Sequence, residues 1–482
     1  GVYISGSASH GTMQNATFTN CTIKGATAIE VKYTDLTLDK CTVEATVKTP
    51  SYAKNNNGMT ALGFAVVSTD NSKAGETPVP TGTVTIKGKG NYKGLVGLGS
   101  LESVKETYKD FEDKTIKVSG GTFYNAVLPE YCADGFIPTK NADGTYGVKQ
   151  GTYVASIGDT KYETLAAAIE AAARNSTVKL IANTRENVTI STPYVTLDLN
   201  GFTLNGGQEK GKPALTVTAR VTVTDSSTAQ TGTIMREDTA KNSGVSPHYV
   251  IDIQGSGWLT FESGKVTNNS GNTEGKGAFL VRVGDASVAK YPGLNIKGGT
   301  FTQDNFIVIK VDRGDLFLNG GTLNSANSYA IENWHRATIK GGTVNGTAAA
   351  WTYSDGPNSD LTISGGIING DVLSVNYGSA EGKVAKVKIT GGTVNGALDT
   401  RSYDPTTGEL TSITDASKAT IGITGGTFKK DPTKYVIEDS AITANADGTF
   451  GVAKAYLAKV GNTSYYTMDE AFKAQTASGE AI

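Results

Sequence analysis

Residues suited to acid–base chemistry and to sugar binding gather between positions 310 and 355. Arg313, His335 and Asp355 are separated by 22 and 20 residues, so in a structure repeating with that period they lie at one level of successive repeats. Lys310 and Glu332 share this spacing. Flat aromatic rings beside hydrogen-bonding groups are typical of sites that stack against sugar rings. The predicted glycan-binding patch consists of Trp334, His335, Arg336, Trp351, Tyr353 and Asp355.

Two other interpretations of this patch are open. Carboxylates beside a basic residue would suit a polysaccharide lyase or a glycoside hydrolase acting on an outer face of the fold. The carboxylates are few for such an enzyme: Glu332, Asp355 and the more distant Asp312 and Asp315. The alternative is a solvated turn of mixed charge, in which Lys310 pairs with Glu332 across neighbouring repeats. We therefore predict no catalytic residue, and we expect no metal and no cofactor.

A Gly-Gly pair, followed by Thr or Ile and an apolar residue, recurs through the C-terminal half of the chain. The second glycines are Gly299, Gly321, Gly342, Gly366, Gly392 and Gly426, spaced by 22, 21, 24, 26 and 34 residues. A period near 22 with variable insertions is typical of a solenoid. The repeats alternate Ile, Val, Phe and Thr without a leucine consensus, which favours a parallel β-helix over leucine-rich repeats.

An asparagine stands three residues after the second glycine in four consecutive repeats. These residues are Asn324, Asn345, Asn369 and Asn395. If the repeats stack about 4.8 Å apart, each side-chain amide reaches the next one. We therefore predict a structural asparagine ladder at one corner of the fold.

The same alignment places the segments 331–333, 351–353 and 375–377 in register, so that Tyr353, Tyr377 and Tyr403 stack. Near the start of the chain, Cys21-Thr22 and Cys41-Thr42 recur at a spacing of 20 residues. Cys21 and Cys41 are therefore expected one repeat apart. Parallel side-chain directions favour a reduced pair over a disulfide, although neighbouring repeats are close enough for either.

A longer repeat has the size of a domain. Residues 120–123, 141–148 and 153–169 resemble 425–428, 445–452 and 456–472, at offsets of 305, 304 and 303 residues. We predict that residues 1–150 form the C-terminal part of one unit and a linker, that 151–454 form a complete unit, and that 455–482 begin another. Each unit starts with a short helix, at 163–173 in the complete unit, where Thr164 is the N-cap and the helix covers the first repeat.

The order of this helix and of the strands expected at 177–180, 188–190 and 195–201 resembles the opening of pectate-lyase-like right-handed parallel β-helices. The segments 141–148 and 153–160 resemble linkers between such domains in large cell-surface, adhesin-like proteins of Firmicutes. The resemblance implies an all-β chain of right-handed parallel β-helix (solenoid) units in tandem. It also implies an extracellular location on a bacterial cell surface, a role as stalk or adhesin, and glycans or host surface proteins as partners.

The composition excludes two other classes of protein. The 44 Lys and Arg nearly balance the 46 Asp and Glu, and no run of five like charges indicates a nucleic-acid groove. No apolar stretch approaches the roughly 20 residues that a membrane-spanning helix needs. We therefore expect no nucleic-acid partner and no membrane span.

Overall fold

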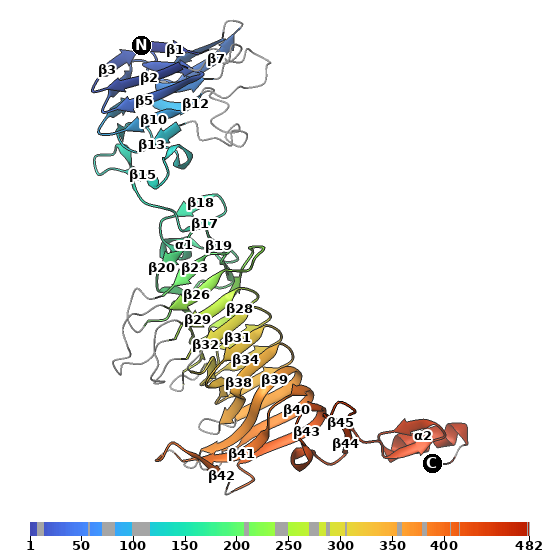
Figure 1. The fold of residues 1–482 in the computed structure, drawn as a ribbon. Coiled ribbons are helices and arrows are strands. Elements are labelled where there is room, and N and C mark those ends of the chain that lie inside the picture. The colour runs from blue at the N-terminus through green and yellow to red at the C-terminus, as the bar shows by residue number, and fades with distance from the viewer. Residues whose placement is uncertain are drawn as a thin grey trace. The chain divides into compact units, whose positions relative to one another are not determined.

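The computed structural model describes residues 1–6, 14–55, 58–69, 82–98, 116–206, 212–236, 249–268, 279–285, 290–303, 306–353, 359–377, 383–404, 406–413, 415–479 and 481. In this part of the chain strands predominate, most of them paired in parallel, and the two α-helices are short. The prediction of an all-β chain is thereby confirmed. The chain divides into two compact units, Gly1–Thr152 and Tyr153–Ile482 (Figure 1).

The first unit contains three parallel sheets that consecutive strands enter in turn, so every third strand returns to the same sheet. The first sheet holds β1 (Val2–Ser5), β4 (Ile29–Lys32), β9 (Phe64–Thr69) and β12 (Leu95–Leu98). The second holds β2 (Gln14–Thr19), β5 (Thr34–Asp39), β10 (Val84–Lys87) and β13 (Ile116–Val118). The third holds β3 (Thr22–Gly25), β6 (Thr42–Ala45), β11 (Asn91–Lys93) and β14 (Thr122–Phe123). A hairpin of β7 (Ser51–Asn55) and β8 (Gly58–Leu62) interrupts this order.

The second unit follows the same rule over a longer stretch, because each strand from β19 to β35 pairs in parallel with the third strand after it. Three strands therefore form one repeat. The first strands are β19 (Thr177–Leu180), β20 (Thr184–Arg185), β21 (Val188–Ile190), β22 (Val195–Asp198), β23 (Thr203–Asn205), β24 (Leu215–Val217), β25 (Arg220–Thr224), β26 (Thr233–Arg236) and β27 (Ile251–Ile253). They continue with β28 (Trp258–Phe261), β29 (Lys265–Asn268), β30 (Val281–Val283), β31 (Gly293–Ile296), β32 (Thr300–Gln303), β33 (Ile309–Val311), β34 (Asp315–Leu318), β35 (Thr322–Ser325), β36 (Tyr329–Asn333) and β37 (Arg336–Ile339).

The strands lengthen toward the C-terminal end of this stack (Figure 1). β38 pairs with both β35 and β36, so one strand spans positions that two strands occupy in earlier repeats. The long strands are β38 (Thr343–Tyr353), β39 (Ser359–Tyr377), β40 (Ala385–Val394) and β43 (Ala419–Phe428). Beside them, β41 (Leu398–Tyr403) forms an antiparallel pair with β42 (Leu410–Ser412).

Alternate residues of each short strand point inward and build columns of apolar side chains. One column runs through Val195, Val221, Leu259, Leu294 and Leu316, which are successive register partners and are all buried. Stacking like side chains at the strand spacing fills the interior without large voids. The β-branched and aromatic residues of the repeat are therefore explained by packing.

The Gly-Gly pairs occupy tight corners between strands. Gly321 has a φ of +79°, and a Cβ there would lie 2.8 Å from the carbonyl oxygen of Gly299 in the preceding repeat. Only glycine accepts this conformation and this approach without strain. The 22-residue period in the sequence thus marks one backbone corner per repeat.

Different elements cover the two ends of the second unit's stack. At its start, β17 (Ala155–Ile157) and β18 (Thr160–Tyr162) precede α1 (Leu165–Ala171), whose Leu165, Ala168 and Ile169 side chains are buried in the core. Thr164 caps the helix by accepting a hydrogen bond from Ala167 N, and the Glu186 carboxylate accepts bonds from two further amides of the first turn. At its end, the antiparallel hairpin of β44 (Ser440–Ala444) and β45 (Phe450–Lys454) pairs with β43.

The end of the first unit is built like the end of the second, at an offset of 304 residues. The 3₁₀ helix Pro129–Tyr131 and the hairpin of β15 (Phe136–Lys140) and β16 (Tyr146–Gln150) correspond to the 3₁₀ helix Thr433–Tyr435 and to β44 and β45. After the second hairpin come β46 (Ala458–Val460), β47 (Thr463–Tyr465) and α2 (Met468–Ser478), in the order of β17, β18 and α1. The long repeat of the sequence is therefore also a repeat of structure. No helix in the described part of the chain is long and apolar enough to cross a membrane.

Candidate functional site

A column of charged side chains lies on one outer face of the second unit. Asp252, Arg282, Lys310 and Glu332 are register partners on the neighbouring strands β27, β30, β33 and β36, and we call them the charge column. Each is the central or outward residue between apolar or amide side chains that point inward. The strand periodicity therefore forces four charged groups onto one line.

The first two members form a buried ion pair. Arg282 donates from Nε and Nη2 to the two carboxylate oxygens of Asp252, at 3.0 and 2.8 Å, and its guanidinium lies 4.5 Å from the ring centre of Tyr249. Burial opposes the charge of Arg282, but the hydrogen bonds and the charge of Asp252 raise its pKa above the usual value. Burial also raises the pKa of Tyr249 to about 12. This end of the column is closed and neutralised.

The other end places one lysine between two carboxyl groups. Lys310 Nζ lies 3.3 Å from Asp312 Oδ1 and 3.8 Å from Glu332 Oε1. The side chains of these three residues are between 11 and 15% exposed. Burial raises the pKa of both carboxyl groups, against the opposing charge of Lys310. A carboxyl group that holds its proton toward neutral pH can donate a hydrogen bond or a proton.

Aromatic rings surround this lysine and Glu332. Trp334 donates from Nε1 to Glu332 Oε1 at 2.6 Å, and Lys310 Nζ lies 4.1 Å from the centre of the Trp334 ring. Trp351 follows Glu332 as its register partner on β38. The Trp351 ring is 6% exposed, and its Nε1 has no hydrogen-bond partner among the described residues.

Trp351 belongs to an apolar group on this outer face, separate from the main core. Trp351, Tyr353 and Val375 are its buried members, and Trp334 packs against them. We call the whole group the aromatic cluster, with the further members Tyr329, Leu373, Tyr377, Tyr403 and Leu410. These further residues and Trp334 are half-buried, so the edge of the cluster meets the solvent.

The register of β38 differs from the predicted one. Trp351 pairs with Glu332 and Leu373, and Tyr353 pairs with Val375, because the ladder between β38 and β39 is shifted at Ala348. The expected alignment of 351–353 with 331–333 and 375–377 is therefore wrong. The three tyrosines nevertheless meet, with Tyr353 ring centres 5.2 and 5.5 Å from those of Tyr377 and Tyr403.

The residues that follow Trp334 lie at a different position. The His335 side chain is 9% exposed, its Nδ1 lies 2.8 Å from Gly314 O, and its ring stacks on Tyr291 at 4.7 Å. Arg336 makes two hydrogen bonds to Asp315, at 2.6 and 2.9 Å. His335 is thus held by backbone and ring contacts, and none of its listed contacts is with the aromatic cluster.

The structure therefore divides the predicted patch. Trp334, Trp351 and Tyr353 come together beside Lys310 and Glu332, whereas His335 and Arg336 gather around Asp315 and Tyr291. Asp355 lies outside the described residues.

Sequence reasoning missed two members of the charge column, Asp252 and Arg282. A usable signal was present, because each is a charged residue between two buried β-branched residues, in Ile-Asp-Ile and Val-Arg-Val. Lys310 stands in the same setting, in Ile-Lys-Val. A charged residue at the centre of such a triplet indicates the outer position of a short strand.

The predicted asparagines occupy one line along β35, β38 and β39 and reach the end of β40. Each donates from Nδ2 to Oδ1 of the preceding asparagine, at 2.7, 2.7 and 2.6 Å. The first of them, Asn324, donates to Thr302 Oγ1 at 3.3 Å. We call Asn324, Asn345, Asn369 and Asn395 the asparagine column. Its side-chain amides bond to one another and leave no buried charge to neutralise.

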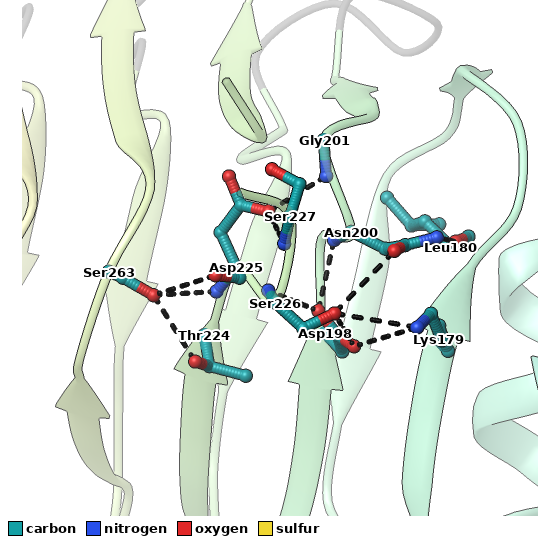
Figure 2. A network of polar contacts seen from close by, with 10 residues as sticks. All are labelled: Lys179, Leu180, Asp198, Asn200, Gly201, Thr224, Asp225, Ser226, Ser227 and Ser263. Atoms are coloured by element: carbon teal, nitrogen blue, oxygen red, sulfur yellow. Dashed lines mark hydrogen bonds and ion pairs between the residues drawn. The ribbon is translucent and has the colours of Figure 1, made fainter. Parts of the chain in front are cut away.

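A second polar group lies near the start of the unit and also has a structural explanation. Figure 2 shows Asp198 and Asp225 at the corners that follow β22 and β25. Asp198 accepts hydrogen bonds from Asn200 N and from the amide and hydroxyl of Ser226, at 3.0, 2.9 and 2.7 Å. Lys179 Nζ lies 3.7 Å from the same carboxylate.

Asp225 is satisfied by the backbone alone. It accepts hydrogen bonds from the amides of Gly201, Ser227 and Gly232, at 2.8, 3.1 and 2.6 Å. Burial would raise the pKa of Asp225, but these bonds lower it below the usual value. The carboxylates of this network hold corners in place and have few lone pairs left for a ligand. In the described part of the chain, no group of three or more His, Cys, Asp and Glu residues is placed to hold a metal ion.

Comparison with protein-family models, with curated proteins and with solved structures found no match. The functional assignment therefore depends on the repeats and on the geometry of this outer face.

Proposed function

We propose that the chain is a segment of an extracellular bacterial surface protein, composed of right-handed parallel β-helix units in tandem that serve as a stalk or adhesin. The observation that carries this proposal is the structural repeat at an offset of 304 residues. A 3₁₀ helix and a hairpin end each unit, and two strands and a short helix follow each time. Such recurrence is typical of chains that gain length from repeated units.

The third-strand pairing supports the β-helix in particular. Parallel strands that return every three elements, with apolar columns inside, are what a three-sided coil requires. The resemblance to pectate-lyase-like surface proteins supports the extracellular location.

A deletion tests the β-helix directly. Removing residues 300–321 takes away β32, β33 and β34 and joins Gly299 to Thr322, which restores a Gly-Gly-Thr corner. In a β-helix the shortened chain still unfolds cooperatively, because β29, β30 and β31 find new partners in β35, β36 and β37. The matched control removes residues 300–310, half a repeat, and is expected to unfold the stack. Equal loss of structure in both deletions would contradict the β-helix.

The location has its own test. Antibodies against the second unit are expected to label intact cells of the source bacterium. Labelling only after the cells are broken open would exclude a surface role.

A second candidate function is glycan binding at the aromatic cluster. Trp334 and the half-buried Tyr377 and Tyr403 offer ring faces, and Lys310 and Glu332 offer hydrogen-bonding groups beside them. A sugar ring stacks on such a face while its hydroxyl groups bond to the polar rim.

Calorimetry against neutral and acidic polysaccharides tests this second candidate. Trp334→Ala and Tyr403→Ala are expected to weaken saturable binding at least tenfold. Tyr194→Ala is the matched control, since Tyr194 is an exposed ring that stacks under Arg174 and does not belong to the aromatic cluster. Equal binding by all three variants would remove the cluster from consideration.

The same polysaccharides decide between a binding protein and a lyase or hydrolase. If new chain ends appear and Glu332→Gln abolishes them, the carboxyl group of Glu332 acts as an acid or base. Binding without cleavage supports the surface role.

A further inference from the structure

Two thiols face each other at the first turn of the first unit. Cys21 and Cys41 stand immediately before β3 and β6, and Thr42 N donates to Cys21 O at 2.8 Å. The Sγ atoms of the two cysteines are 3.1 Å apart, and both cysteines are free. Neighbouring parallel strands therefore hold the two thiols in contact.

The backbone at each cysteine has the same form. Asn20 and Lys40, which precede the cysteines, have φ values of +51° and +56°. The two side chains therefore leave equivalent corners in the same direction. Because the corners are alike, the contact between the thiols is built into the strand register.

The surroundings leave room on one side of the pair. Cys41 is fully buried and donates to Phe18 O at 3.2 Å, whereas Cys21 is half-buried. Gly90 precedes Asn91 as Cys41 precedes Thr42, so the next turn has no side chain at this position. Access to the pair is therefore through Cys21.

We propose that Cys21 and Cys41 are a disulfide site. A disulfide has an S–S length of about 2.05 Å, so the sulfur atoms need to approach by about 1 Å. The oxidant is a low-molecular-weight disulfide such as oxidised glutathione. The Cys21 thiolate attacks one sulfur of the oxidant, and the first glutathione leaves as a thiol after taking up a proton. The Cys41 thiolate then attacks the Cys21 sulfur of the mixed disulfide and releases the second glutathione. Two protein thiols are oxidised to one disulfide while one oxidant disulfide is reduced to two thiols.

This bond would join the edge of the stack to its interior. Within the described residues, β2 pairs only with β5, and β3 pairs only with β6. Edge strands open more easily than strands with partners on both sides. The bond closes a 20-residue loop across this edge and stabilises the folded state mainly by restricting the unfolded chain.

Mass spectrometry of the whole chain tests the proposal. After incubation of the folded protein with oxidised glutathione, we expect a loss of two hydrogen atoms, one alkylatable thiol in place of three, and a peptide pair linked through Cys21 and Cys41. Thermal unfolding of the first unit is expected to shift upward by roughly 5–10 °C. Hydrogen exchange of the β2 and β3 amides is expected to slow.

The variants separate the bond from other effects. Cys41→Ser and Cys21→Ser are expected to lose the shift in unfolding temperature on oxidation, whereas Cys132→Ser, which changes the other buried cysteine of the unit, keeps it. Three alkylatable thiols after oxidation, or a lasting glutathione adduct on Cys21, would overturn the proposal.

The rate of bond formation gives a readout that a merely structural thiol pair would not show. Burial and the hydrogen bond to Cys41 raise the pKa of Cys21 to about 11. The thiolate is therefore scarce at neutral pH, and the rate is expected to increase about tenfold per pH unit between pH 7 and 9. A rate independent of pH would contradict attack by Cys21.

Discussion

The asparagine column and the charge column are built on the same register but solve opposite problems. In the asparagine column each amide both donates and accepts, so identical residues repeat along the strands. In the charge column identical residues would repel one another, and each group needs a neighbour of opposite sign or an aromatic face. Uniform columns therefore extend a stack, whereas mixed columns mark places where the stack carries something else.

The largest expected effect comes from breaking the buried ion pair. Arg282→Ala leaves Asp252, which is 2% exposed, without its partner. The expected loss in the free energy of unfolding is about 3–5 kcal/mol, because an uncompensated buried charge is costly. Urea unfolding measures it. The double variant Asp252→Leu with Arg282→Met is expected to recover most of the loss, and failure to recover would mean that the pair itself holds the strands.

The pH dependence distinguishes the charge column from the polar corners. The folded pKa of Glu332 is raised, so its contribution to stability is present below the unfolded pKa of about 4.3 and is lost as the pH rises through the folded pKa. The folded pKa of Asp225 is lowered, so its contribution is present above about 3.9 and is lost as the pH falls through the folded pKa.

Unfolding in urea at a series of pH values checks both signs. Relative to the unmodified chain, Glu332→Gln is expected to gain stability as the pH rises from 4 to 7. Asp225→Asn is expected to be less stable than the unmodified chain at pH 7, with the difference shrinking toward pH 2. Parallel curves for the two variants would contradict the opposite roles of these carboxyl groups.

A smaller effect is expected in the asparagine column. Asn345→Ala removes a bond to Asn324 and one from Asn369, both at 2.7 Å. Because the column is partly exposed, water replaces much of the loss, and the expected cost is about 1 kcal/mol. Chemical denaturation measures it, with Asn319→Ala, which breaks one exposed amide contact to Asn295, as a milder comparison.

The smallest effect is expected at the exposed counterpart of the buried pair. Arg336 bonds to Asp315 with the same two-point geometry as Arg282 to Asp252, but its side chain is 54% exposed. Arg336→Ala is expected to cost less than about 1 kcal/mol in the same urea experiment. A cost equal to that of Arg282→Ala would show that geometry, and not burial, sets the strength of these pairs.

The sequence predicted the strand character and the long repeat because both depend on local patterns. Glycine corners, alternating apolar residues and the recurrence of residues 141–148 at 445–452 are visible without coordinates. Thr164 as the N-cap of a short helix was predictable for the same reason and is confirmed.

The composition of the outer face was predicted only in part. The shift in the ladder at Ala348 moves Trp351 beside Glu332, and no single repeat of the sequence records such a shift. Trp334 and His335 are adjacent in sequence, yet their rings join different groups on either side of the corner after β36. Spacing along a chain gives the level of a residue in a stack, but the backbone at each corner decides which way its side chain points.

The recurring end segments also bear on how such a gene changes in size. The turns at Asn141 and Asn445 share the same hydrogen bonds to Thr145 and Thr449, each at 2.9 Å, and the flanking sequences are nearly the same. Recombination between the two coding segments would add or remove about 304 codons, which is one unit with both of its ends. Every strand on either side of the exchange would keep its partners. A protein of this kind can therefore vary in the number of its units between generations without passing through a misfolded intermediate form.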